Sequence, residues 1–397
     1  MREFTLPEKD SMTASIAEKQ SAPPRTATVV RGIADIDDGR GFIRVSGYQR
    51  SPLDIPLTAA QIRDYGLRDG DLVEGTAAPR DQDRKNGGGI RGTTMTSVET
   101  ISGIPAAQAR VRPRFDSLTP IHPNERIRLE NGDTSPTARI IDLVSPIGKG
   151  QRGLIVAPPK AGKTMVLKTI ARAIANAYPE IHLMLVLVGE RPEEVTDLRR
   201  TVRGEVIAST FDQSPSDHIK AAELAIERAK RLAELGRDVV VMLDSLTRLG
   251  RAYNLAAPAS GRTLTGGVAV SALQPPRQFL GAARCIEEGG SLTILSTVLI
   301  DTGSQLDSVL FEEFKGTGNM ELRLRRDLAE KRIFPAIDPA PSGTRREDLL
   351  MNAEEHAAVV SLRRALAALD SQHALELLID KTAAPNEQFL RQVSAAR

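Results

Sequence analysis

The sequence predicts a doubly wound α/β domain with a mostly parallel sheet, preceded by a small all-β barrel. Two observations predict this arrangement. From about residue 140, continuous Ile, Val and Leu runs of strand length alternate with helical stretches, which is typical of a parallel sheet covered on both faces. Before residue 104, short β-rich runs are broken by Asp-Gly turns, which is typical of an antiparallel barrel. The 397 residues are enough for two or three such domains.

Composition excludes several classes of protein. The 53 Lys and Arg residues nearly balance the 51 Asp and Glu residues, so the net charge is +2 and any nucleic-acid site must be a local patch. The single cysteine, Cys285, excludes an internal disulfide and a zinc site with several cysteine ligands. Apolar runs stay far below the roughly 20 residues that a bilayer span needs, and no signal-peptide segment follows Met1. We therefore expect a cytoplasmic protein with no membrane partner.

The all-β domain is expected over residues 27–103. Residues 1–26 mix small, polar and charged side chains without a period and predict a flexible tail. Residues 104–130, rich in Pro and Arg, predict an extended linker. The expected barrel strands are Thr28–Ile36, Gly41–Val45, Asp71–Thr76 and Thr93–Ile101.

The α/β domain is expected over residues 131–397. Lys163–Ala177 carries apolar side chains at helical spacing, and His218–Leu235 is also compatible with a helix. Residues 350–397, rich in Ala, Leu and charge, predict two or three packing helices at the C-terminal end. The expected strands of the parallel sheet are Arg152–Val156, Ile181–Val188, Val239–Leu243 and Leu292–Leu299.

A phosphate-binding loop is the sharpest chemical signal. The sequence Ala-Pro-Pro-Lys-Ala-Gly-Lys-Thr at 157–164 follows a predicted buried strand and precedes a predicted helix, with Ala157 at the usual first-glycine position. Backbone N–H groups of such a loop bind phosphates, Lys163 reaches the β and γ oxygens, and the Thr164 hydroxyl holds Mg²⁺. The alternative is an ordinary helix N-terminus that happens to contain Gly-Lys-Thr.

Two carboxylates at strand ends supply the rest of a hydrolytic site. Asp244 follows the apolar run Val239–Leu243, where it would complete the Mg²⁺ shell, or else cap the next turn. Glu190 ends another predicted strand and would polarise the water that attacks the γ-phosphate, or else belong to a solvated acidic turn. The polar loop 342–346 could present Arg345 as an arginine finger, but on these grounds surface charge is the favoured explanation.

The run from Leu143 to Arg345 closely resembles the family of bacterial Rho transcription termination factors, which are hexameric ATP-dependent RNA translocases and helicases. The resemblance covers nearly the whole second domain in long segments at consistent spacing. It implies a RecA-like P-loop ATPase domain preceded by an OB-fold barrel of the cold-shock type. The matching segments are residues 146–153, 157–164, 190–196, 243–248, 281–290, 311–321 and 334–338.

The resemblance also implies roles for single residues. Glu190 becomes the catalytic carboxylate, Arg345 becomes the arginine finger acting in trans with Arg332 nearby, and Met165 and Phe334 form an adenine pocket. Lys163, Glu190, Asp244 and Arg345 are then the catalytic set, with ATP and Mg²⁺ as ligands. The implied nucleotide-binding residues are Gly148, Lys149, Gly150, Gln151, Arg152, Gly153, Lys160, Ala161, Gly162, Lys163, Thr164, Met165, Arg191 and Phe334.

Two loops of the family line a central pore as a secondary RNA site. Here they are residues 258–267 and 301–305, and Gln305 stands where the family usually has a basic residue. Gly189 stands where the family commonly has Asp, next to the catalytic carboxylate, so the hydrolysis rate could be altered. The implied pore residues are Arg262, Thr263, Leu264, Thr265, Gly266, Gly267 and Gln305.

The first domain resembles the family's primary RNA site. Residues 39–44 match an RNP-like strand, and the period of two places Arg40, Phe42 and Arg44 on one face, where they would bind single-stranded RNA. Arg40 and Pro56 replace aromatic residues of the family, so Phe42 would be the main stacking ring. The alternative places Phe42 in the barrel core.

The leading hypothesis is therefore an ATP-dependent RNA translocase that binds nascent RNA, acts on the RNA polymerase complex and terminates transcription as a homohexameric ring. A second hypothesis is a Rho-like paralogue, an RNA-binding regulatory ATPase with weak or no translocation. A third, a rotary ATPase, shares the RecA-like core but has no use for the RNP-like strand at residues 39–44.

Overall fold

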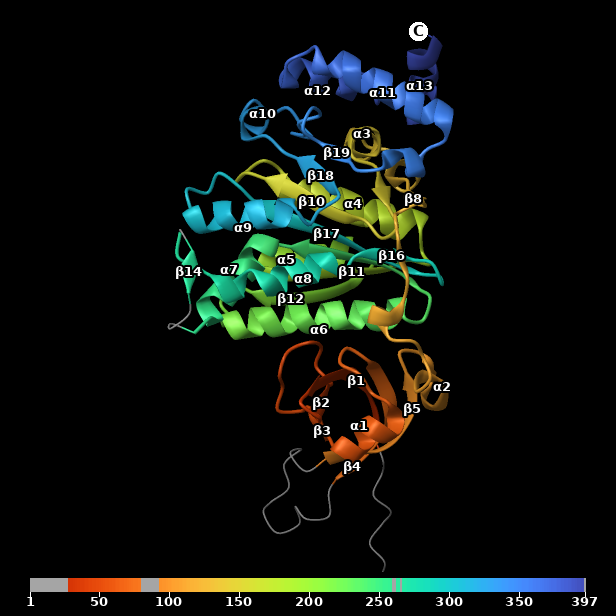
Figure 1. Ribbon diagram of the computed structural model, residues 1–397, viewed down its shortest axis with the longest axis vertical. Helices are drawn as coiled ribbons and strands as arrows, with labels where there is room; N and C mark the ends of the chain where they lie inside the picture. Colours follow the sequence, from red (N-terminus) through yellow and green to blue (C-terminus); the bar gives the residue numbers. More distant parts are fainter. Residues whose placement is uncertain (1–27, 80–92, 259–261, 265, 396–397) are drawn as a thin grey trace, which may run out of the picture.

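The computed structural model describes residues 28–79, 93–258, 262–264 and 266–395. In Figure 1 the all-β domain lies at one end, the large sheet with its helices fills the middle, and the C-terminal helices form the opposite end. The predicted tail, residues 1–26, lies outside the described residues.

The first domain is a six-stranded antiparallel sheet in the order β3-β2-β1-β4-β5-β6. Apolar side chains from alternate strand positions form its core, which includes Ile43, Val73 and Ile101. Its elements are β1 (Thr28–Asp37), β2 (Arg40–Arg44), β3 (Ile55–Leu57), α1 (Ala59–Tyr65), β4 (Leu72–Pro79), β5 (Thr93–Ile101), β6 (Ile104–Pro105) and α2 (Ala106–Ala109).

The second domain is built on a sheet in the order β12-β11-β13-β17-β10-β18-β19, with β16 and β7 added beside β17. Neighbouring strands along the sheet order β12-β11-β13-β17-β10-β18 pair in parallel. The bounds are β7 (Pro120–Ile121), β10 (Arg152–Ala157), β11 (His182–Glu190), β12 (Glu205–Thr210), β13 (Asp238–Asp244), β16 (Arg284–Ile286), β17 (Ser291–Leu299), β18 (Met320–Arg323) and β19 (Gly343–Thr344). Two short pairs lie outside this sheet: β8 (Arg126–Ile127) with β9 (Ile147–Gly148), and β14 (Thr263–Leu264) with β15 (Val268–Ala269).

Both faces of this sheet are covered, as a doubly wound fold requires. Neighbouring strand residues enter different cores: Ile155 packs with α3, α4, α5 and the C-terminal helices, whereas Leu154 packs with α6 to α9. The helices are α3 (Pro136–Val144), α4 (Lys163–Ala177), α5 (Pro192–Thr201), α6 (Pro215–Ala233), α7 (Leu246–Ala256), α8 (Gln274–Gly281), α9 (Gln305–Lys315), α10 (Arg326–Glu330), α11 (Ala353–Ala367), α12 (Ser371–Lys381) and α13 (Asn386–Ala395). Short 3-10 turns are η3 (Phe115–Ser117), η4 (Leu129–Asn131), η5 (Val270–Ala272) and η6 (Glu347–Leu350).

The segment 104–130 differs from the extended linker that its composition predicts. Its first part, β6, pairs with β5 and completes the barrel sheet, while β7 pairs with β16 of the large sheet. Phe115 is buried in the second domain's core. The prolines interrupt helical periodicity, but short strand pairs and a buried aromatic side chain still fix the segment against both domains.

A buried ion-pair network joins the two domains. The carboxylate of Glu234, at the end of α6, is fully buried and lies 3.0 Å from Arg68 of the barrel, 3.4 Å from Arg112 and 3.1 Å from Arg231. It also accepts the backbone N–H of Phe115 at 2.8 Å. Because a buried carboxylate needs such partners, removal of any one of these arginines should loosen the contact between the domains.

Candidate nucleotide site and nucleic-acid interface

The phosphate loop lies where β10 ends and α4 begins. Two residues of the loop adopt left-handed backbone conformations, Lys160 with φ 66° and Gly162 with φ 89°. These turns bring the chain sharply from the sheet edge into α4, whose first residue is Lys163. The N–H groups of the first turn of α4 therefore face the edge of the sheet, which is the arrangement that binds phosphate.

Lys163, Glu190 and Asp244 meet at this edge. The ammonium nitrogen of Lys163 lies 3.0 Å from Glu190 Oε1 and 2.5 Å from Asp244 Oδ1. Glu190 ends β11 and Asp244 ends the neighbouring β13, so parallel pairing delivers both carboxylates to the same place. The hydroxyl of Thr297 donates to Asp244 Oδ1 at 2.7 Å. The three residues that sequence reasoning selected separately thus form one cluster.

Burial and charge tune the acid–base properties of this cluster. Burial lowers the pKa of Lys163, but Asp244 and Glu190 outweigh it and raise the pKa above its usual value, so the ammonium stays charged. Burial and the adjacent Asp244 raise the pKa of Glu190, while Lys163 and Arg248 oppose that rise. A carboxylate with raised proton affinity is a stronger base, which suits a group that takes a proton from water.

The donor set also suits a magnesium ion and a nucleotide. The Thr164 hydroxyl and the Asp244 carboxylate are hard oxygen donors, the kind that Mg²⁺ prefers. The ring of Phe334 lies 3.6 Å from the position that a Cβ would take on Gly162. The side chain of Met165, three residues after Gly162, is 57% exposed. An apolar ring and an open thioether next to the loop fit the predicted adenine pocket. Arg191 follows Glu190 directly and is exposed.

Arg345 lies at the opposite edge of the sheet from its own chain's phosphate loop. Thr344 pairs with Met320, and Met320 pairs with Gly153 near the start of β10, whereas the phosphate loop follows Ala157 at its end. From Gly153 to Ala157 the strand rises about 13 Å, farther than an arginine side chain reaches. Arg345 is exposed at this edge and is therefore directed away from its own nucleotide site.

The structure places residues 148–153 away from the phosphate loop of their own chain, at the same edge of the sheet as Arg345. They too lie at the start of β10, and they have other partners: Lys149 forms ion pairs with Glu125 and Asp238, and Gln151 Nε2 donates to the side chain of Asn319 at 2.6 Å. A Cβ on Gly150 would clash with the backbone of Cys285. The predicted nucleotide-binding residues at this edge are Gly148, Lys149, Gly150, Gln151, Arg152 and Gly153, so a nucleotide that they contact would be bound by the phosphate loop of another copy.

The two predicted pore loops lie against each other. A Cβ on Gly266 would lie 3.2 Å from the backbone of Gln305, so the end of the first loop packs on the end of the second, where α9 begins. Arg262 and Gln305 are both exposed. Thr263, Leu264 and Gly267 are exposed as well, whereas Thr265 lies outside the described residues.

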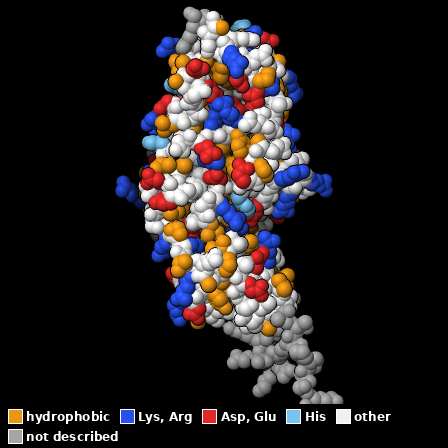
Figure 2. Space-filling model, turned by 90° about the vertical axis from the view of Figure 1, so that its right-hand side faces the viewer, with side chains coloured by type: hydrophobic (Ala, Val, Ile, Leu, Met, Phe, Trp, Pro, Cys, Tyr) orange, Lys and Arg blue, Asp and Glu red, His pale blue; other side chains and the backbone are white. Residues whose placement is uncertain are grey.

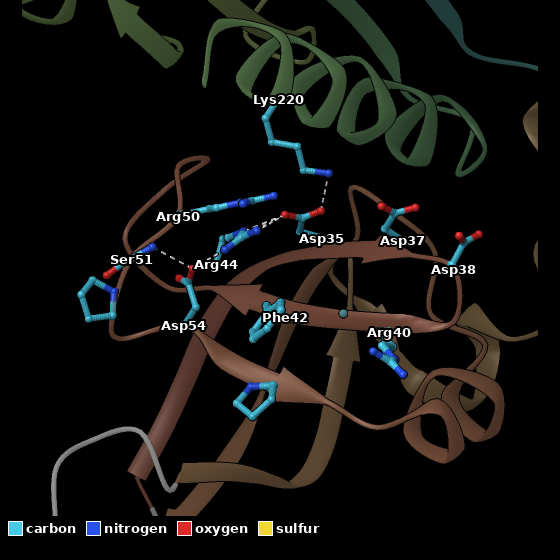
Figure 3. A pocket seen from close by; sticks show the side chains of 13 residues that line it. Asp35, Asp37, Asp38, Arg40, Phe42, Arg44, Arg50, Ser51, Asp54 and Lys220 are labelled. Atoms are coloured by element: carbon cyan, nitrogen blue, oxygen red, sulfur yellow. Dashed lines mark hydrogen bonds and ion pairs between the residues drawn. The ribbon is translucent and has the colours of Figure 1, made fainter. Parts of the chain in front are cut away.

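A pocket of about 920 Å³ opens between the barrel and α6 (Figure 3). Phe42 is 44% exposed at its wall, which argues against a place in the barrel core, and Arg40 is exposed nearby. Phe42 pairs across the sheet with Pro56. The lining residues are Asp35, Asp37, Asp38, Arg40, Gly41, Phe42, Arg44, Arg50, Ser51, Pro52, Asp54, Pro56 and Lys220.

Arg44 does not lie free on this wall as the period of two predicts. Its guanidinium is buried and forms ion pairs with Asp35 and Asp54, and Lys220 Nζ lies 2.5 Å from the other oxygen of Asp35 (Figure 3). The guanidinium also lies 5.5 Å from the centre of the Phe42 ring, so it supports the ring from behind. The carboxylates of Asp35 and Asp54 are too far along the chain for strand periodicity to reveal this pairing.

The surface carries no extended field of one sign on the face drawn in Figure 2, where basic and acidic side chains are interspersed. This agrees with the nearly balanced charge of the chain. Within the described residues, none of the helices has both the length and the apolar character of a membrane-crossing helix. The described residues also contain no group of three or more His, Cys, Asp and Glu placed to bind a metal by themselves.

Sequence reasoning missed Arg248 as a member of the site. Its Nη2 lies 3.5 Å from Glu190 Oε1, and it reaches this place from the first turn of α7, directly after Asp244 and Ser245. The available signal was its spacing: Arg248 follows Asp244 by four residues, and the first turn of a helix brings such a side chain back to the end of the preceding strand.

Family comparisons match both domains. Residues 137–344 match the nucleotide-binding domain of the ATP synthase alpha/beta family, and residues 30–106 match the RNA-binding domain of the Rho termination factor. Two solved type III secretion ATPases share the fold of the second domain. One, from pathogenic bacteria, has a TM-score of 0.55 at 24% identity and covers 70% of this chain and 82% of that one. The other, the assembled ATPase EscN of enteropathogenic E. coli, has a TM-score of 0.55 at 26% identity and covers 68% and 62%.

Curated relatives extend the likeness along nearly the whole chain. The transcription termination factor Rho of Micrococcus luteus is 58% identical over 92% of this chain and 54% of its own length. The Rho of Mycobacterium tuberculosis strain H37Rv is 53% identical over 97% of this chain and 64% of its own. The Rho of Streptosporangium roseum is 56% identical over 92% of both chains. The chain thus spans between half and two thirds of several relatives and most of another.

Proposed function

The chain belongs to the family of Rho transcription termination factors, and its second domain to the ATP synthase alpha/beta nucleotide-binding family; on that premise we propose that it is an RNA-dependent ATPase. It assembles as a homohexameric ring in the cytoplasm, binds nascent single-stranded RNA and moves along it as a translocase and helicase. Its action on the RNA polymerase complex terminates transcription. The observation that carries the proposal is the cluster of Lys163, Glu190 and Asp244 in a chain that also has an RNA-binding barrel.

Lys163, Glu190 and Asp244 are placed to change partners when ATP binds. The ammonium of Lys163 pairs with the carboxylates of both Glu190 and Asp244. On ATP binding, Lys163 moves to the β and γ phosphates; Thr164 and Asp244 would hold Mg²⁺, which would supply further positive charge there. Glu190 then loses its ammonium partner, and its proton affinity rises further. It orients the attacking water and accepts a proton from it.

The second half of the site comes from a neighbouring copy. Arg345 is exposed at the far edge of the sheet and cannot reach Lys163 of its own chain. In a ring of identical chains joined head to tail, the edge that carries Arg345 faces the phosphate loop of the next copy. Arg345 then neutralises charge that develops on the transferred phosphate.

RNA contacts the protein in two places. The barrel offers the exposed ring of Phe42 and the charge of Arg40 as the primary site. The loops that carry Arg262 and Gln305 form the secondary site in the pore. The loop of Gln305 leads directly into α9, which packs against the large sheet. A movement at the nucleotide edge of the sheet can therefore reach the RNA through α9 and this loop.

A second candidate is an RNA-binding regulatory ATPase with weak or no translocation. The observation that favours it is the replacement of a basic side chain by the neutral Gln305 in the pore, with Gly189 in place of a carboxylate beside Glu190. Such a chain would bind RNA through its barrel and hydrolyse ATP slowly.

Turnover of ATP by the purified full chain, with and without single-stranded RNA, tests the proposal. We expect a many-fold rise with RNA and none with duplex DNA. Lys163→Ala should abolish the rise, because the phosphates lose their ammonium partner. An RNA-independent rate in the wild-type chain would overturn the proposal. A strong RNA response without release of transcripts from stalled transcription complexes would favour the second candidate.

A further inference from the structure

A polar chain connects the barrel to the catalytic edge of the large sheet. It begins in the loop between β2 and β3, where the Gln49 amide reaches the end of β12, and passes to α6. Gln49 Nε2 lies 3.2 Å from the carbonyl oxygen of Ala208, and Gln213 Nε2 lies 2.9 Å from Gln49 Oε1. Ser209 Oγ lies 2.7 Å from Gln213 Oε1 and 2.5 Å from His218 Nδ1.

The carbonyl of Ala208 fixes the direction of every hydrogen bond in this chain. A carbonyl oxygen only accepts, so Gln49 turns its NH₂ group toward Ala208 and its oxygen toward Gln213. Gln213 therefore donates to Gln49 Oε1, and its own oxygen accepts from both Gln49 Nε2 and the Ser209 hydroxyl. The single hydroxyl hydrogen of Ser209 goes to Gln213, which leaves its oxygen free only to accept.

His218 must then be the donor at Nδ1, and this determines its tautomer. Neutral imidazole carries one N–H, so Nε2 is left with a lone pair. Burial lowers the pKa of His218, Asp217 and Asp212 raise it, and Arg248 lowers it, with a net decrease from its usual value. The ring is therefore neutral at pH 7, with an acceptor at Nε2.

His218 Nε2 and the side chain of Arg248 both lie near Gly189. A Cβ on Gly189 would lie 3.9 Å from His218 Nε2, 3.2 Å from Arg248 Cδ and 3.4 Å from Arg248 Nη1. Gly189 has φ 67° at a bulge in β11, and with no side chain there the ring and the guanidinium approach the same space. Arg248 in turn lies 3.5 Å from Glu190.

We propose that His218 is a positioning residue for hydrolysis: held in its Nδ1–H tautomer by Gln49, Gln213 and Ser209, it attracts Arg248 and keeps that guanidinium beside Glu190. The inference rests on the proposed ATPase function. Arg248 so placed favours the charged form of Glu190, which is the form that accepts a proton. Because Gln49 belongs to the barrel, the placement of the RNA-binding domain contributes directly to the geometry of the catalytic edge.

Two substitutions at residue 218 separate this role from a structural one. The amide of Asn sits where imidazole has Nδ1, so His218→Asn keeps a donor for Ser209 but leaves nothing near Arg248. The amide of Gln sits where imidazole has Nε2, so His218→Gln keeps an acceptor for Arg248. We expect kcat for ATP with saturating RNA to fall about tenfold in His218→Asn and less than threefold in His218→Gln, with KM for ATP unchanged in both.

Two further variants, Gln213→Leu and its control Tyr48→Phe, test whether the hydrogen bonds from Gln49 determine the tautomer of His218. Gln213→Leu interrupts the series of hydrogen bonds from Gln49 to His218 and should lower kcat as His218→Asn does. Tyr48→Phe removes another contact between the same loop and the second domain, the hydrogen bond from the Tyr48 hydroxyl to Glu205. The hydrogen bonds from Gln49 to His218 stay intact. Tyr48→Phe should keep the wild-type kcat, whereas a merely structural effect of loop docking would lower both alike.

The outcomes separate the inference from the proposed function. Equal kcat values for His218→Asn and His218→Gln, or an unchanged kcat in Gln213→Leu, would overturn the inference while wild-type turnover stands. A wild-type chain without ATP turnover would overturn the proposed function and the positioning role together.

Discussion

Arg44 is expected to stabilise the barrel rather than to bind RNA, and Arg44→Met tests this. The guanidinium is 6% exposed, and its partners Asp35 and Asp54 are 5% and 4% exposed. Removing one partner of a buried ion pair costs about 3–5 kcal/mol. Here Lys220 still pairs with Asp35 at 2.5 Å, and the backbone N–H of Ser51 still donates to Asp54 at 2.8 Å. We therefore expect a loss of about 2–4 kcal/mol in the free energy of opening of the barrel.

Hydrogen exchange of the full chain measures this opening in peptides from β1 to β3. Arg40→Met is the matched control, because Arg40 lies exposed on the same strand and its replacement should cost no more than about 0.5 kcal/mol. Adding Asp54→Asn to Arg44→Met should restore part of the loss, since one unpaired buried charge disappears. If Arg44→Met exchanges no faster than Arg40→Met, the buried pairing does not stabilise the barrel and the assignment is wrong.

Three further predictions concern catalysis, RNA binding and pH. Glu190→Gln should bind ATP with nearly wild-type affinity but stop turnover, as measured by equilibrium binding beside a phosphate-release assay; turnover at the wild-type rate would exclude Glu190 as the base. Arg40→Ala should flatten the plot of log affinity for a pyrimidine-rich RNA against log salt by about 0.7, the contribution of one phosphate contact; an unchanged slope would remove Arg40 from the interface. Burial raises the pKa of Asp69 to about 6, so its ionisation opposes folding as pH rises from about 4 to about 6. Asp69→Asn should therefore stabilise the chain at pH 7 by about 1–3 kcal/mol and have little effect at pH 4, in denaturant titrations at both values; equal effects at both would contradict the assigned pKa.

Local patterns predicted that Lys163, Glu190 and Asp244 meet at one edge of the sheet. The loop before Lys163 is recognised from consecutive residues, and the continuous apolar strands before Glu190 and Asp244 fix which edge of a parallel sheet both carboxylates reach. These features depend on chain order and strand direction alone. Fold class and the two-domain arrangement follow for the same reason.

Features that depend on contacts between distant residues were not predictable. The period of two placed Arg44 on the RNA-facing wall, but Asp35 and Asp54 bury it. The family resemblance grouped residues 148–153 with the loop at 157–164, and only the course of β10 shows that the two segments lie at opposite ends of one strand. Arg248 was missed although its spacing from Asp244 was visible, because its partner Glu190 lies on a different strand, far away in the sequence.

Mixing two inactive variants tests the central claim most directly, namely that each nucleotide site combines Lys163 of one copy with Arg345 of the next. Lys163→Ala and Arg345→Ala chains should each lack RNA-stimulated ATP turnover. Rings assembled from both contain some interfaces with an intact Lys163 on one side and an intact Arg345 on the other, so turnover should return in the mixture. Mixed rings, verified by mass, that remain as inactive as either variant alone would contradict the shared site.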